Sequence, residues 1–343
     1  MKVIIMAGGQ GIRFWPWSVK KKPKQFLPLK NGKTMLQETY ERYKSWVSIQ
    51  KIYVVTTEGY YTLVKEQLPD LPQEQILLEP ERRDTGPCVA LTALNFLDKD
   101  DDEVLVMSPS DHHISNPEEL MKSLLLAEKV AKKENSIVTL GISPTRPETG
   151  YGYIKVINNI PQDNQALKVE EFIEKPSLSD AEKLLNNDHI FWNSGIFVWK
   201  PSTIAYYMEK FQSHLWNTLK DGKDQLKKTY STLPKISVDY AILEKANTIY
   251  TIPTNFEWDD LGSWTAMERL NEKDNNKNIL IGNVNAISSN NCIVISHLND
   301  KTLALGVTDL IIVLTEDGLL VCHKSLEQEI KNILNYLNDL NVK

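Results

Sequence analysis

The chain has 343 residues, of which 41% are hydrophobic and 24% charged, and its formal net charge is −6. This length predicts two domains, or one large domain with an appendage, around a buried core. The negative charge argues against a protein that coats nucleic acid or a membrane surface, so any phosphate binding must be local. No apolar run approaches the roughly 20 residues that span a bilayer.

The cysteines indicate the redox compartment. The chain has three, Cys88, Cys292 and Cys322, which are far apart and show neither metal-ligand spacing nor a disulfide pattern. No secretory leader is recognisable at the N-terminus. We therefore expect a reduced, cytoplasmic protein.

A buried strand predicted at Val3–Ala7 runs directly into a glycine-rich loop with Gly8, Gly9 and Gly11. Glycines let backbone N–H groups approach phosphate oxygens and adopt the positive φ of an anion-binding nest. The spacing matches neither a P-loop nor a dinucleotide fingerprint. Arg13 and Lys24 follow, and they would supply positive charge where a pyrophosphate leaves. The segment therefore predicts a binding site for a nucleoside triphosphate.

Strands and helices alternate through the first half of the chain. The further strands are expected at 52–57, 75–78, 104–107 and 137–140, and helices at 34–47, 86–97 and 117–132. This alternation predicts a mostly parallel sheet covered on both faces, with ligands at the carboxyl ends of its strands.

The pattern changes after Gly141, where antiparallel-type strands are expected at 151–157, 167–173 and 191–199, followed by a helical stretch from 201 to about 219. A polar linker is predicted at 271–278. Beyond it, short apolar segments are spaced like the turns of a β-helix or β-roll, and an amphipathic helix is expected at 325–340.

Two acids are candidate ligands for Mg²⁺, which usually takes one or two protein carboxylates together with phosphate oxygens. Asp111 follows an apolar strand, and Asp260 lies in a loop rich in tryptophan and acids. The alternative for Asp111 is a turn or cap residue. Asp259 is expected to cap the following helix, and His112 and His113 to be loop or structural residues.

A third group of side chains suits a sugar phosphate. Glu174 can accept hydrogen bonds from vicinal hydroxyls, Lys175 can bind a phosphate monoester, and Asn193 can bridge two hydroxyls. The alternatives are a solvated ion pair and a satisfied turn residue. No Ser, Cys or His has a partner at recognisable spacing, so the sequence favours direct in-line transfer without a covalent intermediate.

Taken together, these motifs resemble the sugar-1-phosphate nucleotidyltransferases, and within them the mannose/guanylyl branch. The segments that carry the resemblance run in family order over residues 1 to about 270, and the tail 306–313 is also similar. They are Ala7-Gly8-Gly9-Gln10-Gly11-Ile12-Arg13-Phe14-Trp15-Pro16, Pro23-Lys24-Gln25-Phe26, 147–154, 172–176, Trp192-Asn193-Ser194-Gly195-Ile196-Phe197, Ser237-Val238-Asp239-Tyr240-Ala241 and Trp258-Asp259-Asp260-Leu261-Gly262-Ser263-Trp264.

The resemblance implies a fold, a reaction and roles for matched residues. The fold is α/β, with a Rossmann-like, GT-A-like nucleotidyltransferase domain over 1–270, built on a mixed central sheet, and a small C-terminal left-handed β-helix-like domain over 279–343. The reaction is GMP transfer from GTP to mannose 1-phosphate, assisted by Mg²⁺. The implied roles are nucleotide binding by Gly8, Gly9, Gly11 and Glu79, catalysis by Arg13 and Lys24, metal binding by Asp111 and Asp260, and sugar phosphate binding by Gly152, Glu174, Lys175 and Asn193.

Two positions depart from the family pattern. Asp84 stands where an asparagine is usual, so its carboxylate could accept from guanine donors or alter base selectivity. Val19 stands where an arginine often follows the serine, which removes one positive charge near the triphosphate.

Three other functions remain open at this stage. The same chemistry could act on another hexose 1-phosphate or another nucleoside triphosphate. A non-catalytic nucleotide-sugar-binding regulatory subunit would not need the whole charged set. A GT-A glycosyltransferase would carry an Asp-x-Asp motif, which Ser108–His113 lacks. We further expect a homodimer through the C-terminal domain, with no catalytic side chain from that domain.

Overall fold

The computed structural model describes residues 1–28, 32–133, 135–157, 165–187 and 189–341. Two compact units make up the chain. The sheet unit comprises Met1–Gly8 and Leu36–Trp258, and the β-helix unit comprises Gly9–Met35 and Asp259–Lys343. Part of the glycine-rich segment is thus packed with the C-terminal residues. The division into domains at 1–270 and 279–343 stays a prediction. The compact units have other bounds, because residues 9–35 and 259–278 belong to the same unit as the C-terminal residues.

The sheet unit is built on a nine-stranded sheet of order β3-β2-β1-β4-β9-β6-β10-β8-β7. Strands β1 to β4 are parallel to one another, whereas β9 runs antiparallel to both β4 and β6. The strands are β1 (Lys2–Met6), β2 (Ile52–Thr57), β3 (Ile76–Glu79), β4 (Leu105–Pro109), β6 (Ile137–Ile142), β7 (Gly152–Val156), β8 (Leu167–Glu174), β9 (Ile190–Trp199) and β10 (Ile249–Thr254).

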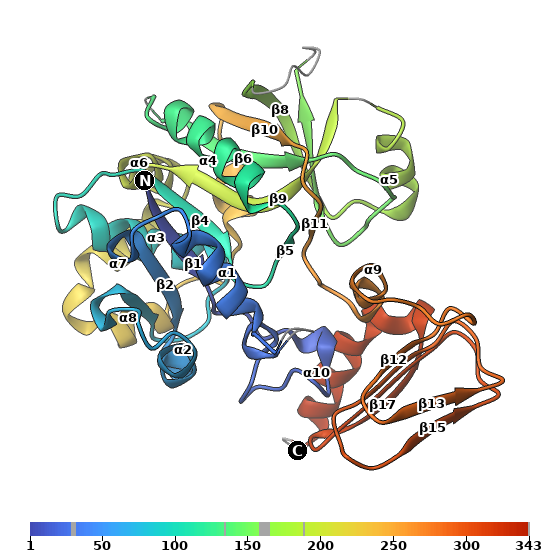
Figure 1. Cartoon of the computed structure of the whole chain (residues 1–343). Helices are drawn as coiled ribbons and strands as arrows, with labels where there is room; N and C mark the ends of the chain where they lie inside the picture. The colour runs from blue at the N-terminus through green and yellow to red at the C-terminus, as the bar shows by residue number, and fades with distance from the viewer. Residues whose placement is uncertain (29–31, 134, 158–164, 188, 342–343) are drawn as a thin grey trace. The chain divides into compact units, whose positions relative to one another are not determined.

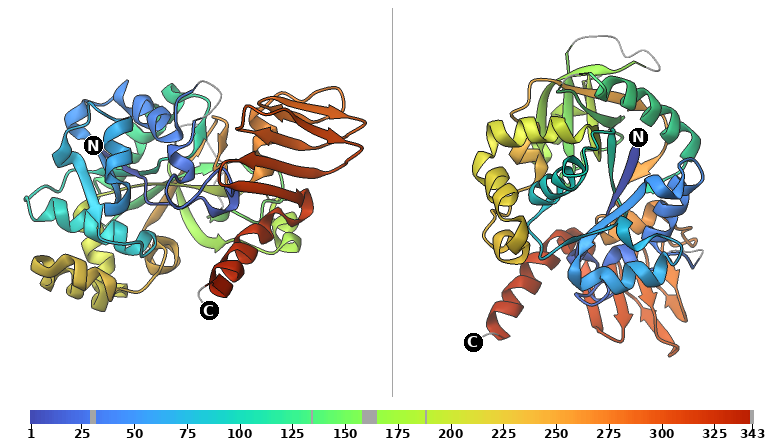
Figure 2. Two further views of the ribbon diagram at one scale, coloured as in Figure 1. Left: turned by 90° about the horizontal axis from the view of Figure 1, so that it is seen from below. Right: turned by 90° about the vertical axis from the view of Figure 1, so that its left-hand side faces the viewer.

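Helices cover both faces of this sheet, as Figure 2 shows. Helix α3 packs with α6, α7 and α8 on one face, while α1 and α4 lie on the other. The helices are α1 (Met35–Lys44), α2 (Tyr61–Gln67), α3 (Thr85–Leu97), α4 (Pro117–Ala131), α5 (Leu178–Leu184), α6 (Pro201–Phe211), α7 (Ser213–Asp221) and α8 (Leu226–Ser231). The prediction of an α/β fold with a mixed central sheet is confirmed.

Local sequence explains several of these boundaries. Helix α4 begins where the Asn116 side chain accepts a hydrogen bond of 3.1 Å from the Glu119 N–H, with a proline at the first helical position. The helical stretch predicted from 201 to about 219 is confirmed as two consecutive helices, α6 and α7. They are separated at Gln212, which leaves helical geometry and donates from its side-chain amide to the Ala241 carbonyl.

The β-helix unit stacks apolar residues in register from one turn to the next. Strands β12, β14 and β16 pair in parallel, so that Ile279, Ile293 and Ile311 lie above one another in its core. The strands are β12 (Ile279–Ile281), β13 (Val284–Ile287), β14 (Ile293–Ser296), β15 (Thr302–Leu305), β16 (Leu310–Thr315) and β17 (Gly318–His323), of which β17 is antiparallel to β16. The predicted small β-helix is confirmed.

Residues before the β-helix complete its core. Phe14 and Trp264 are buried in the same apolar cluster as the stacked isoleucines, and their rings lie 4.8 Å apart. Two short helices, η8 (Trp264–Ala266) and α9 (Met267–Leu270), follow β11 (Trp258–Asp259), where the chain passes from one unit to the other.

The segment 271–278, predicted as a linker, is an ordered turn instead. Asn278 is 1% exposed, and its amide donates to the Ser289 carbonyl at 2.9 Å and accepts from the Cys292 N–H at 2.9 Å. Residues 272–277 are exposed, whereas the buried Asn278 side chain has both its donor and its acceptor group hydrogen-bonded. The predicted terminal helix begins as a 3₁₀ turn, η9 (Lys324–Glu329), and continues as α10 (Ile330–Asn341).

Among the described residues, no helix has both the length and the apolar character needed to cross a bilayer. The cysteines are all free thiols, of which Cys88 and Cys292 are buried.

Candidate active site

The glycine-rich loop has one position where only glycine fits. Gly11 has φ +59°, and a Cβ there would lie 2.4 Å from the Lys24 Cβ and 2.9 Å from the Ser18 Oγ. Nearby, the Gln25 side chain donates a hydrogen bond of 2.9 Å to the Gly9 carbonyl. The glycine-rich loop, predicted to bind the nucleotide, is therefore held against the segment that carries the predicted catalytic residue Lys24.

The remaining loop glycine, Gly8, lies in the sheet unit beside Glu79. A Cβ on Gly8 would be 3.3 Å from the Glu79 Oε2, and Arg82 donates to the Gly8 carbonyl at 3.0 Å. The Glu79 side chain is buried at the end of β3, and its Oε1 accepts from the Tyr230 hydroxyl at 2.5 Å. Burial raises the pKa of Glu79, although the Tyr230 hydrogen bond opposes that rise.

Asp84 has a structural role that the sequence did not indicate. Its carboxylate accepts a hydrogen bond of 2.8 Å from the Thr85 N–H at the start of α3, and its φ of +68° is unusual for a residue other than glycine. An asparagine could make the same cap. Backbone strain of this kind is frequent at functional sites, which is compatible with a role in nucleotide binding. The contact of Asp84 with guanine stays a prediction.

The four residues predicted to bind the sugar phosphate come together in the sheet unit. Gly152 of β7 pairs with Glu174 of β8, and a Cβ on Gly152 would lie 2.6 Å from the Glu174 Oε2 and 3.5 Å from the Asn193 Cβ. Lys175 forms an ion pair with Glu174 and has φ +45°. Burial alone would lower the pKa of Lys175, but the Glu174 carboxylate raises it. The lysine is therefore cationic and suited to a phosphate.

A further acid, Asp239, belongs to this cluster. Its Oδ1 accepts a hydrogen bond of 3.4 Å from the Asn193 Nδ2, while the Asn193 Oδ1 accepts from the Thr139 hydroxyl at 3.0 Å. Asp239 begins a π-helix over Asp239–Leu243, a conformation that is frequent at functional sites. Burial raises its pKa to about 6, and the nearby Glu174 carboxylate adds to the rise.

Asp239 lay within one of the motifs that carry the family resemblance, but the sequence assigned it no role. The motif around Asp239 was the one sequence signal that could have indicated a role for it. The proximity of Asp239 to Asn193 could not be predicted, because the two residues are 46 positions apart in the sequence.

Arg13, Lys24 and Asp260 lie in the β-helix unit. The Lys24 Nζ donates to the Asp260 main-chain carbonyl at 2.7 Å, and the Asp260 Oδ1 accepts from the Gly262 N–H at 2.7 Å. Gly262 makes room for this carboxylate, because a Cβ there would be 2.5 Å from the Asp260 Oδ2. The Arg13 guanidinium donates to the Gln328 side chain at 3.3 Å.

Asp259, next to Asp260, is a structural acid. It is 5% exposed, accepts a hydrogen bond of 2.9 Å from the Leu261 N–H and forms an ion pair with Arg269. The expectation that Asp259 caps the following helix is wrong, because Ser263 is the N-cap of η8 and no side chain caps that helix. The two neighbouring carboxylates thus have different environments, and Asp260 is the better candidate for a metal.

The other predicted metal ligand, Asp111, lies in a turn after β4 in the sheet unit and is half-buried. Within the described part of the chain, no three His, Cys, Asp or Glu side chains are grouped as a metal site. Mg²⁺ usually takes one or two protein carboxylates and its other ligands from phosphates and water, and the assignment of Asp111 and of Asp260 to it stays a prediction.

A pocket of about 460 Å³ opens beside the glycine-rich loop within the β-helix unit. Its lining includes Gln10, Ile12 and Lys20 of the N-terminal segment and Leu334 of α10. Val19, the position where the family often has an arginine, also lines it.

Comparison with known protein families identifies two regions in the chain. The model of a family described as nucleotidyl transferase matches residues 2–277, and one described as a MannoseP isomerase/GMP-like beta-helix domain matches residues 282–337. The chain belongs to the nucleotidyl transferase family. The resemblance seen in the sequence motifs is thereby confirmed.

Similar proteins align along nearly the whole chain of this nucleotidyl transferase. A mannose-1-phosphate guanylyltransferase of Salmonella montevideo is 36% identical over 349 residues, covering 96% of this chain and 72% of the relative. The alginate biosynthesis protein AlgA of Pseudomonas fluorescens is 34% identical over 349 residues, covering 98% and 71%. A crystal structure from Thermus thermophilus, described as a mannose-1-phosphate geranyltransferase, superposes with a TM-score of 0.86 at 31% identity and covers 98% of this chain and 99% of its own.

Proposed function

We propose that this protein transfers GMP from GTP to mannose 1-phosphate, giving GDP-mannose and pyrophosphate. The observation that carries the proposal is the cluster of Gly152, Glu174, Lys175 and Asn193, which offers hydroxyl acceptors, an amide and a cation at one place in a nucleotidyl transferase fold. Alignment with a mannose-1-phosphate guanylyltransferase over 96% of the chain supports the choice of substrates.

The proposed reaction is a direct displacement. A phosphate oxygen of mannose 1-phosphate attacks the α-phosphorus of GTP, and the bond from that phosphorus to the oxygen bridging to the β-phosphate breaks. Pyrophosphate takes the bonding electrons and leaves. In this proposal Arg13 neutralises the charge that grows on pyrophosphate, and Lys24 neutralises charge at the reacting phosphates.

We propose that Glu174 and Asn193 bind mannose hydroxyls and that Lys175 binds the phosphate. Gly152 lets the sugar approach the main chain, since a Cβ there already crowds Glu174. Asp239 orients the Asn193 amide from the side opposite Thr139. Glu79 would accept from the guanine edge through Oε2, because Oε1 is engaged by Tyr230; Asp84 is a second candidate for guanine.

Asp111 and Asp260 would hold Mg²⁺. The space that Gly262 leaves for the Asp260 carboxylate fits this role, as does the hard oxygen donor that it presents. The metal would supply charge neutralisation on the phosphate oxygens of GTP.

The decisive measurement is pyrophosphate release over a matrix of nucleoside triphosphates and sugar 1-phosphates, with Mg²⁺ or with EDTA. We expect the highest kcat/KM for GTP with mannose 1-phosphate, and no release with EDTA. A higher value for another pair would instead favour that substrate. Tight GDP-mannose binding without turnover of any pair would favour a regulatory subunit.

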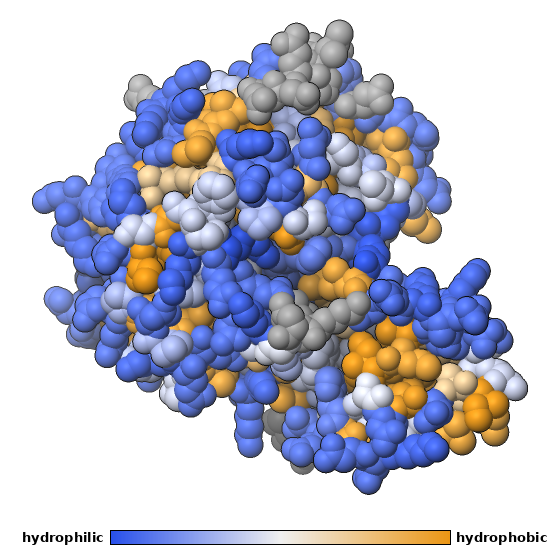
Figure 3. Space-filling view, in the orientation of Figure 1, coloured by the Kyte–Doolittle hydropathy of each residue, from blue (hydrophilic) through white to orange (hydrophobic). Residues whose placement is uncertain are grey.

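We also propose a cytoplasmic homodimer in which the β-helix unit forms the contact. Its strands β13 and β15 expose Ile287, Leu303 and Leu305 to solvent by 53%, 56% and 63%, and Ile287 lies opposite Leu305 in the ladder. Apolar surface is visible over this part of the molecule in Figure 3. Contiguous exposed apolar side chains mark protein contacts, and a second copy is the simplest partner. Sedimentation should give a dimer for the native chain and a monomer for Leu305→Asp.

A further inference from the structure

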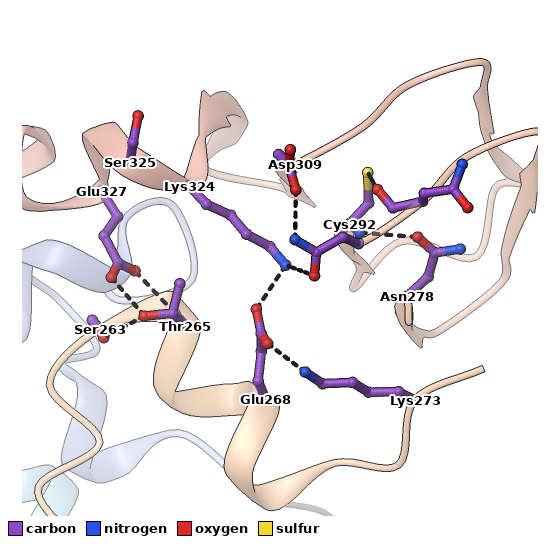
Figure 4. A network of polar contacts seen from close by, with 12 residues as sticks. Ser263, Thr265, Glu268, Lys273, Asn278, Cys292, Asp309, Lys324, Ser325 and Glu327 are labelled. Atoms are coloured by element: carbon purple, nitrogen blue, oxygen red, sulfur yellow. Dashed lines mark hydrogen bonds and ion pairs between the residues drawn. The ribbon is translucent and has the colours of Figure 1, made fainter. Parts of the chain in front are cut away.

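The 3₁₀ turn η9 (Lys324–Glu329) contacts segments that carry predicted catalytic residues. Three of its side chains, Lys324, Glu327 and Gln328, reach elements that lie at least 50 residues away in sequence. Figure 4 shows Lys324 and Glu327 pointing from this turn toward the short helices that follow Asp260. The turn therefore connects the β-helix to the candidate active site.

Glu327 makes the contact with the most specific geometry. One carboxylate oxygen accepts from the Thr265 N–H at 2.9 Å, and the other accepts from the Thr265 hydroxyl at 2.6 Å. Both donors belong to one residue at the start of η8, so the carboxylate fixes its main chain and its side chain together. Hydrogen bonds to a charged acceptor are stronger than neutral ones.

Lys324 secures the next turn of the same segment. Its Nζ donates to Glu268 of α9 at 2.6 Å and to Asn291 of the β-helix at 2.9 Å. Lys273 is the second cation on Glu268. Burial alone would raise the pKa of Glu268, but Lys273 and Lys324 lower it. Glu268 is therefore ionised, and the contact is an ion pair with little exposure.

The loop held in this way is the one that presents Asp260. The Asp260 carboxylate accepts a hydrogen bond from the Gly262 N–H, and the Asp260 main-chain carbonyl accepts one from Lys24. Thr265 lies three residues beyond Gly262, so a shift of its main chain moves the groups that orient Asp260 and Lys24. Displacements of about 1 Å can cost about 10²-fold in rate when reacting groups must be aligned.

We propose that Glu327 is a positioning residue for the nucleotidyl transfer, acting through Thr265 on the loop that carries Asp260. The inference rests on the proposed function. It gives the β-helix a part in catalysis without placing any of its side chains on a substrate.

The test compares Glu327→Gln with a matched control, Glu329→Gln, in the full-length protein. Glu329 lies in the same turn and carries the same charge, but its carboxylate accepts from Asn332 of α10. We expect Glu327→Gln to lower kcat by about 10-fold or more with KM for mannose 1-phosphate changed by less than about twofold. Glu329→Gln should leave both constants within about twofold of the native values.

A second measurement reads the contact without turnover. Hydrogen–deuterium exchange at the Thr265 amide should be faster in Glu327→Gln than in the native protein and unchanged in Glu329→Gln. Thr265→Val, which keeps the N–H and removes the hydroxyl, should lower kcat less than Glu327→Gln. The double variant should be no slower than Glu327→Gln, because both changes act on one contact.

These outcomes separate the two proposals. If native protein fails to turn over GTP and mannose 1-phosphate, the proposed function is wrong, and with it the positioning role that rests on it. If native protein is active and Glu327→Gln behaves like Glu329→Gln, the positioning role alone is wrong. A loss of kcat without faster exchange at Thr265 would also overturn it. If Glu327→Gln does not fold, Thr265→Val decides by the same two measurements.

Discussion

The Lys24 ammonium donates a hydrogen bond of 2.7 Å to the main-chain carbonyl of Asp260, 236 residues further along the chain. Lys24 is 3% exposed, and its Nζ also lies 5.6 Å from the centre of the Phe14 ring. A predicted catalytic cation and a predicted metal ligand thus share one structural support. Changes at Lys24 should therefore affect the Asp260 loop as well as the charge at the phosphates.

The two neighbouring acids should respond differently to loss of charge. Asp260→Asn is expected to lower kcat by at least about 10²-fold with little loss of stability, because it removes a metal-borne electrostatic contribution. The same result is expected for Asp111→Asn, the other predicted metal ligand. Asp259→Asn is expected mainly to lower the melting temperature, since it weakens the Arg269 ion pair. Steady-state rates at limiting Mg²⁺ and thermal unfolding check this. A near-native rate for Asp260→Asn would make it structural.

Lys175 and Arg13 should affect different kinetic constants. Lys175→Ala is expected mainly to raise KM for mannose 1-phosphate, because the phosphate charge is present in both the ground state and the transition state. Arg13→Ala is expected mainly to lower kcat, because pyrophosphate gains charge as it leaves. Initial rates with each substrate varied in turn measure both constants. The reverse pattern would show that the two phosphate sites are interchanged.

Asp239 should make stability depend on pH. Its pKa of about 6 in the folded protein lies above the ordinary value of 3.8, so between these values the folded protein holds a proton that the unfolded chain has released. Stability should therefore fall as the pH rises through this range, and the loss should persist at higher pH.

Asp239→Asn removes this loss. Its free energy of unfolding should exceed that of the native protein at pH 7.5, by up to about 3 kcal/mol, with the difference disappearing near pH 4. We also expect KM for mannose 1-phosphate to rise, because the partner of Asn193 has changed. Urea unfolding across pH, with the exposed Asp224→Asn as control, tests this. Equal stability at all pH values would exclude the buried-acid interpretation.

Glu103 should contribute to stability at neutral pH. Its carboxylate accepts from Lys51 at 2.6 Å, from the Met1 amino group at 2.9 Å and from Lys2 at 3.0 Å. Burial alone would raise the pKa of Glu103, but these three cations lower it to about 2. The stabilisation is therefore complete above about pH 4.5, the ordinary value, and is lost as the pH falls toward 2.

Glu103→Gln should lower the free energy of unfolding at pH 7 by roughly 1 kcal/mol, because the group is partly solvated. The difference from the native protein should shrink as the pH falls toward 2. Urea unfolding at pH 7 and pH 3 measures it, with the exposed Glu66→Gln as control. A difference that is the same at both values would assign the effect to packing rather than charge.

The sequence alone predicted the parts of this protein that depend on local rules. The strand before Gly8, the cap at Asn116 and the alternation of strands and helices follow from side-chain periodicity, backbone freedom and local hydrogen bonds. The family motifs added the reaction, which no single residue implied. The linker predicted at 271–278 is an ordered turn instead, because the buried Asn278 amide is hydrogen-bonded to distant main-chain groups.

Only the tertiary structure decided which of these residues meet. Asp239 reaches Asn193 across 46 residues, and Glu327 reaches Thr265 across 62. Periodicity tells which face of an element is buried but not which element covers it, because that choice depends on the summed packing of the whole chain. For the same reason, Phe14 and Trp264 joined the core of a β-helix that begins only at Ile279.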